Sequence, residues 1–108
     1  MKFINLTPHQ IKVLDAEGNV DTIIESTGEA RCEQIDGEPK QVGGFTVKPR
    51  SYGNVTGLPA PDPQGAIFIV SQIVAQACPD RYDLVWPGDV KRENGNIIGC
   101  YNFCCVQK

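Results

Sequence analysis

The stretch that most constrains the fold runs from residue 67 to residue 88, IFIVSQIVAQACPDRYDLVWPG. An apolar run over 66–70 is typical of a buried strand. Ser71 follows as a good helix N-cap, and Ile73, Val74 and Ala77 then fall on one face at helical spacing. Pro79 ends this two-turn helix because its ring cannot continue a helix. The polar loop PDRYD leads into a second strand over 82–86, before Pro87-Gly88.

The rest of the chain is cut into short segments by turn residues, which is typical of domains built from strands. A loop over 59–65 contains three prolines, and Asn-Gly at 94–95 predicts a hairpin tip. The sequence predicts strands over 3–6, 11–14, 20–24, 29–35, 45–47, 50–57, 66–70, 82–86, 90–92 with 97–98, and 99–106. We therefore predict a mainly β, α+β fold over a single domain, residues 1–108. It is expected to be a small bent sheet or partly open barrel of short antiparallel strands, with one short helix.

Size and composition indicate one globular domain, with 41% apolar and 21% charged residues among 108. A chain of this length buries a modest core, so a homo-oligomer is expected to supply additional burial. No apolar run approaches the roughly 20 residues that span a bilayer. The N-terminal MKFINLTPH is not typical of a secretory signal. We therefore expect a cytoplasmic location and no membrane partner.

The net charge of −3 is distributed unevenly. Residues 15–38 hold eight acidic side chains and one basic one, Arg31, and most simply form a solvated acidic face. An acidic domain is a poor binder of nucleic acid polymers, which usually need a basic stripe. A local basic pocket for a small anion remains compatible with this charge, because the field in a cleft depends on nearby charges.

Five cysteines occur, Cys32, Cys78, Cys100, Cys104 and Cys105. In a reducing compartment they are expected to be free thiols that pack as small apolar side chains. A zinc site that combines some of them with His9, the only histidine, lacks a paired C-x-x-C knuckle. No local signature marks a cysteine nucleophile. We predict no metal site, no cofactor and no catalytic constellation.

Arginines near planar aromatic side chains suit a nucleotide-like ligand, because rings stack on bases and guanidinium forks bind phosphate. His9 lies at a strand-breaking Thr-Pro, and Ser71 begins a helix whose free backbone N–H groups can face an anion. The candidate ligand-binding residues are His9, Arg50, Tyr52, Ser71, Arg81, Asp83 and Trp86. We place the working part in the PDRYD loop with Trp86, facing Arg50 and Tyr52.

Each candidate also has a purely structural interpretation. Ser71 is more simply a cap than an anion contact. Arg81 and Asp83, two residues apart, can form a local ion pair. Trp86 can be ordinary core, and His9 can be a turn residue. These alternatives stay open at the level of the sequence.

Several phrases together resemble a family of small proteins encoded by tailed phages, prophages and some bacteria. They are NLTPH at 5–9, YGNVTGLP at 52–59, IVS at 69–71, PDRYDL at 79–84, PG at 87–88 and GC at 99–100. The resemblance covers nearly the whole chain. It implies a phage context but no mechanism, because the family has no established activity.

The phage context implies an accessory protein in an infected or lysogenic bacterium. The leading expectation is an anti-defence sponge, which sequesters a cyclic nucleotide or cyclic ADP-ribose type of immune signal without turnover. One alternative is an enzyme that cleaves such a nucleotide with His9 as acid or base. Another is a protein-interaction module that inhibits a host defence protein.

Overall fold

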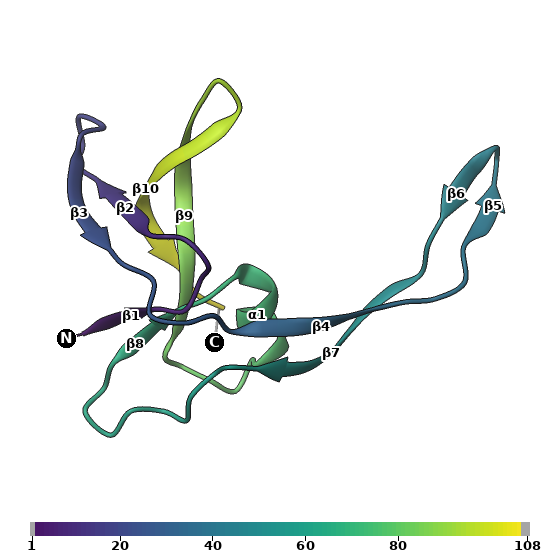
Figure 1. The fold of residues 1–108 in the computed structure, drawn as a ribbon, viewed down its shortest axis with the longest axis horizontal. Helices are drawn as coiled ribbons and strands as arrows, with labels where there is room; N and C mark the ends of the chain where they lie inside the picture. The colour runs from purple at the N-terminus through teal and green to yellow at the C-terminus, as the bar shows by residue number, and fades with distance from the viewer. Residues whose placement is uncertain (1, 107–108) are drawn as a thin grey trace.

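The computed structural model describes residues 2–106, which form ten strands and one short helix (Figure 1). The strands are β1 (Phe3–Asn5), β2 (Ile11–Leu14), β3 (Val20–Ile24), β4 (Arg31–Asp36), β5 (Lys40–Val42), β6 (Phe45–Val47), β7 (Arg50–Thr56), β8 (Ile67–Ile69), β9 (Leu84–Glu93) and β10 (Asn96–Cys104). The helix is α1 (Gln72–Ala77). The predicted fold class, mainly β with one short helix, is confirmed.

A six-stranded sheet forms the body, in the order β1-β8-β9-β10-β2-β3. Its two ends meet at an isolated bridge between Asn5 and Ser26, so the sheet is nearly closed and barrel-like. The predicted hairpins β2–β3 and β9–β10 supply the antiparallel pairs. The pairs β1–β8, β8–β9 and β10–β2 are parallel. The sequence predicted only antiparallel strands, because hairpins between neighbouring segments produce no parallel pairs.

The two hairpins are encoded by their turns. At the tip of β9–β10, Asn94 and Gly95 have φ angles of 52° and 81°, the left-handed pair that a type I′ turn requires. Between β2 and β3, the Asp15 carboxylate accepts hydrogen bonds from the backbone N–H groups of Glu17 and Asn19, each 3.0 Å long. Both predicted turns are confirmed.

Strand β9 is longer than predicted, because it runs through Pro87 and Gly88 without a break. Pro87 pairs with Phe103 of β10, while β8 pairs with β9 only as far as Val85. Pro87 therefore lies where β9 has a partner on one side only, a position in which proline's missing N–H is tolerated. The expectation of two separate strands over 82–86 and 90–92 was wrong for this reason.

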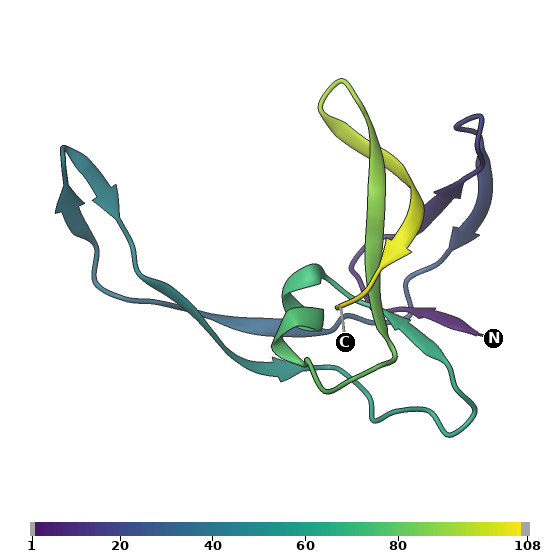
Figure 2. The same cartoon turned by 180° about the vertical axis from the view of Figure 1, so that it is seen from behind.

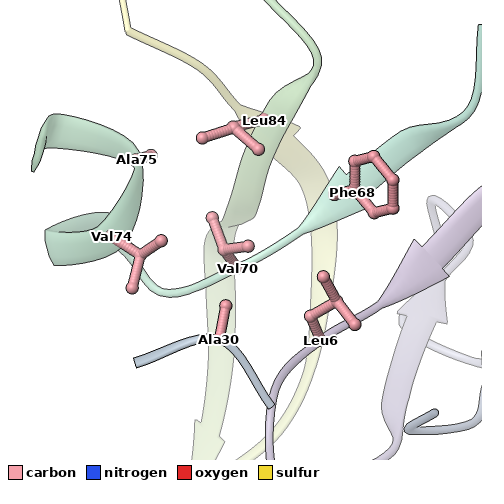
Figure 3. Packing of buried hydrophobic residues seen from close by; sticks show 7 residues of the cluster. All are labelled: Leu6, Ala30, Phe68, Val70, Val74, Ala75 and Leu84. Atoms are coloured by element: carbon pink, nitrogen blue, oxygen red, sulfur yellow. The ribbon is translucent and has the colours of Figure 1, made fainter. Parts of the chain in front are cut away.

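The core forms where β8, α1 and β9 meet (Figure 3). Side chains alternate along the extended run that leads from β8 to the helix. Phe68 and Val70 enter the larger cluster, while Ile69 enters a second, smaller cluster with Ile11 and Cys100. The larger cluster consists of Leu6, Ala30, Phe68, Val70, Val74, Ala75 and Leu84. The apolar run predicted to be buried thus joins the two clusters.

Helix α1 buries only one residue of the predicted face, Val74, together with Ala75. Val74 and Ala75 are buried, whereas Ile73 is 43% exposed and Ala77 is also exposed. The predicted N-cap is confirmed, because the Ser71 hydroxyl accepts a 3.3 Å hydrogen bond from the Val74 backbone N–H. A six-residue helix has too few positions for periodicity to fix its buried face, so packing against β9 and β4 decided it.

Residues 31–56, called the arm below, leave the body as a long two-stranded ribbon (Figures 1 and 2). Strand β4 pairs with β7, and the ribbon continues into the β5–β6 hairpin, whose first strand the sequence did not predict. Every residue from 33 to 52 is exposed. The radius of gyration is 16.4 Å, against about 13 Å for a compact chain of this length. The arm is therefore a projection that packs on nothing within the described chain beyond its base.

Gly57 fixes the point at which the arm returns to the body. Its φ is +78°, and a Cβ at this position would meet the carbonyl oxygen of Glu29. Only glycine combines this backbone angle with such a close approach of two backbone segments. The second glycine of the YGNVTGLP phrase, Gly57, is thus explained by backbone packing.

Candidate functional site

The end of the arm carries an exposed apolar group. We define the arm tip as residues 40–48. Phe45 is 75% exposed there, and Val42 and Val47 are also exposed. The same segment contains Lys40 and Lys48 and no acidic residue. Large apolar side chains that are this exposed, and grouped at one end of a projection, are typical of contact surfaces.

A cavity of about 290 Å³ lies where the two body hairpins separate. It is lined by residues 10–12 at the start of β2, by Pro87 and Val90 of β9, and by residues 97–100 of β10. We call it the hairpin pocket. Its apolar lining includes the half-exposed Ile97, and the Lys12 side chain contributes the one charge among its lining residues. The pocket can accept an apolar group, and Lys12 is the one charged residue at its wall.

The PDRYD loop holds an internal ion pair. Arg81 donates from Nε to Asp83 Oδ1 and from Nη2 to Asp83 Oδ2, each at 2.8 Å. These hydrogen bonds lower the pKa of Asp83 and raise the pKa of Arg81. The adjoining hollow of about 340 Å³ also includes Asp62 and Asp80. With three carboxylates and a paired guanidinium, this hollow disfavours an anion.

Arg50 and Tyr52 do not face the PDRYD loop. Arg50 lies on the arm, where its Nε donates a 2.9 Å hydrogen bond to Asp36 Oδ1. This hydrogen bond raises the pKa of Arg50. Tyr52 lines a separate hollow of about 280 Å³ with Ile73 and other residues of α1. The Arg and aromatic candidates are therefore distributed over separate places in one chain, and the expected arrangement around the PDRYD loop is not formed within it.

His9 belongs to a tight turn organised by Asn5, which the sequence analysis did not single out. Asn5 is fully buried, and its Nδ2 donates to the carbonyl oxygens of His9 at 2.9 Å and Ile24 at 3.0 Å. Its Oδ1 accepts from the backbone N–H and the hydroxyl of Thr7, at 2.9 Å and 2.6 Å. The imidazole of His9 is exposed. The NLTPH phrase therefore encodes a turn whose hydrogen bonds converge on one buried asparagine, and a buried asparagine cannot be recognised from sequence alone.

The remaining candidates have structural partners. Ser71 caps α1, and Trp86 is half-buried and packs against the larger core cluster. Cys100 is buried, which raises its thiol pKa, while Cys104 and Cys105 are exposed. Within residues 2–106, no three His, Cys, Asp or Glu side chains gather into a metal-binding group.

Comparison of the chain with models of protein families, with curated proteins and with solved structures finds no match. The phage-family resemblance therefore stays a prediction. Over the part of the chain that the structure describes, no helix combines the length and the apolar character needed to cross a membrane.

Proposed function

We propose that the protein acts by binding, as a protein-interaction module whose contact element is the arm. The observation that carries this proposal is the run of twenty residues, 33–52, that are all exposed although they form an ordered β ribbon. An isolated two-stranded ribbon is at best marginally stable in water. A partner chain that covers the arm would supply the burial that the ribbon lacks.

The composition of the arm supports a protein partner. Phe45, Val42 and Val47 share one face of the arm tip and offer apolar contact area. Nearer the body, Ile35 and Tyr52 are also exposed, on opposite faces of the ribbon. Aromatic anchors surrounded by polar groups are typical of protein interfaces. The two free edges of the ribbon also offer unpaired backbone groups to an incoming strand.

Photo-crosslinking in cells tests this proposal. A photoreactive amino acid replaces Thr46 in the arm tip, and a second protein carries it at Gln64, an exposed residue of the 59–65 loop, as the matched control. We expect the Thr46 probe to give a discrete protein adduct that the Gln64 probe does not give. The adduct should disappear when Phe45→Ser is added. No arm-specific protein adduct would overturn the proposal.

The second candidate is the sponge, sequestration of a small anionic nucleotide-like signal in a phage context. The observation that favours it is the hairpin pocket, which combines an apolar lining with Lys12. Its volume of about 290 Å³ is close to the lower end, about 300 Å³, of small-ligand pockets. A nucleotide would fill the pocket and extend beyond it, so this candidate also uses surface from a second chain.

Calorimetry with a panel of cyclic dinucleotides, cyclic trinucleotides and cyclic ADP-riboses tests the sponge. Binding that is lost in Lys12→Gln and unchanged in Arg81→Ala would support sequestration in the hairpin pocket. Chromatography of the recovered ligand separates the two nucleotide hypotheses, since an intact ligand indicates a sponge and a cleaved one indicates the His9-dependent enzyme. Failure of the whole panel to bind would exclude this candidate.

A further inference from the structure

The arm and the hairpin pocket are complementary surfaces of the same chain. We propose that the arm tip of one molecule docks in the hairpin pocket of a second copy, with Phe45 as the side chain that enters the pocket. This inference rests on the proposed function and names the partner as the protein itself. It also assigns a role to the hairpin pocket, which is unfilled in an isolated chain.

Size and chemistry match between the two surfaces. Phe45 is the most exposed large apolar side chain of the arm, and it pairs with Val42 beside the turn of the β5–β6 hairpin at the end of the arm. The hairpin pocket, at about 290 Å³, has room for one aromatic side chain, and its mixed lining includes the aliphatic residues Val90 and Ile97 as well as Gln10 and Lys12. Transferring an exposed phenyl ring into such a pocket is worth about 1.5–3 kcal/mol.

Charge is complementary as well. The arm tip carries Lys40 and Lys48 without a carboxylate. The β2–β3 hairpin beside the pocket, residues 11–25, carries one lysine against Asp15, Glu17, Asp21 and Glu25. Opposite charges steer docking and fix its register. The β2–β3 hairpin beside the pocket is therefore net negative, whereas Lys12 lines the pocket itself and Arg92 pairs with the lining residue Ile97, so the steering charge lies on the hairpin and not on the pocket wall.

The occupant has to come from another molecule, because the arm leads away from the β9–β10 hairpin of its own chain (Figures 1 and 2). The extent of the arm fits a stable interface. Its twenty exposed residues set an upper limit on what the arm can contribute, and a standard interface takes 20–30 residues per side and buries about 800 Å² per partner. Two copies that exchange arms reciprocally would form a closed dimer.

Sedimentation of the purified full chain tests the proposal. We expect a dimer that dissociates at least 30-fold more readily in Phe45→Ser, since truncation of an interface anchor costs at least that much. Phe45 is exposed in the isolated chain, so its replacement leaves folding intact, as circular dichroism should verify. Tyr82→Ser is the matched control, because it changes an exposed aromatic residue of the PDRYD loop, outside both the arm and the hairpin pocket.

A mixing experiment identifies the pocket. Ile97→Glu places a charge in the lining of the hairpin pocket. Residue 97 pairs with Arg92 across β9 and β10, so the new carboxylate faces an opposite charge and the hairpin should remain folded. Phe45→Ser keeps an intact pocket, and Ile97→Glu keeps an intact arm. Each variant alone should be monomeric, and their equimolar mixture should regain dimers through one arm–pocket contact.

The outcomes separate this inference from the proposed function. A wild-type monomer at about 100 μM, or a dimer that Phe45→Ser and Ile97→Glu leave unchanged, would overturn the arm–pocket inference. In that case an arm-specific adduct with a different protein would still sustain the interaction function. If neither self-association nor any arm-specific adduct occurs, both are wrong.

Discussion

At the scale of single residues, polar side chains that the sequence offered as ligand contacts are used to hold the chain together. The Arg81 guanidinium is paired twice with Asp83 and is not presented to an anion. Asn5 uses both donors and its carbonyl oxygen inside the turn that contains His9. The residue that does most in this turn is one whose side chain gives no functional signal in the sequence.

Asn5→Ala is expected to destabilise the protein by about 3 kcal/mol. The substitution leaves the carbonyl oxygens of His9 and Ile24 and the N–H of Thr7 without their partner in a partly buried turn, and such groups cost about 1–3 kcal/mol each when fully buried, less where water reaches them. Urea unfolding measures the loss, with exposed Asn54→Ala as the control. A loss below about 1 kcal/mol would mean that the turn tolerates water in place of Asn5.

Arg81→Leu is expected to cost about 1 kcal/mol at pH 7, because it removes a bidentate pair that is largely shielded from solvent. The pKa of Asp83 is lowered in the folded state, so the pair contributes stability above the ordinary value of 3.8. That contribution is lost as the pH falls below 3.8 through the lowered pKa. The difference between wild type and variant in urea midpoint should therefore shrink from pH 7 to pH 3. A difference that is constant with pH would assign the effect to packing.

At the scale of elements, turn and cap residues act as the sequence predicts, whereas partners and buried faces depend on packing. Asn94-Gly95 produces its hairpin and Ser71 its cap. The helix then turns Val74 and Ala75 inward, since β9 and β4 lie on that side. Pro87 remains within β9 because β8 has already ended, a circumstance outside the local sequence.

Ser71→Ala is expected to destabilise the protein by about 1 kcal/mol, through loss of the hydrogen bond from the Val74 N–H. Ser71→Asp should keep the stability, because aspartate is an equally good cap and α1 has no acidic residue in its first turn. Thermal unfolding of the two variants measures this. Equal losses in both would show that the hydroxyl has a role other than capping.

At the scale of the whole molecule, the chain divides into a body with two small core clusters and an arm that shares little of either. Cys32 and Val55 at the base of the arm pack against the larger cluster, and beyond them the ribbon is exposed. The body therefore carries the stability of the fold. The arm is available for contacts with another chain.

Shortening the arm tests this division. Gln34 and Tyr52 pair directly across β4 and β7, so an Asn-Gly turn can replace residues 35–51. We expect the thermal midpoint to stay within about 3 °C of wild type, since the removed residues bury nothing within the chain. Self-association should be abolished. A large drop in the midpoint, measured by circular dichroism at a concentration where both proteins are monomeric, would show that the arm stabilises the body.

The sequence by itself determined the fold class, the turns, the helix cap and the apolar run from 66 to 70, because these follow from local propensity and side-chain period. In the strand predicted over 29–35, the side chains of Ala30 and Cys32 reach the larger core cluster, and beyond them the strand continues where no core exists to receive it. Only the tertiary structure decided that β4 and β7 leave the body, that parallel pairs close the sheet, and that the ligand candidates lie apart. These features depend on contacts between residues far apart in the chain, which local patterns do not encode.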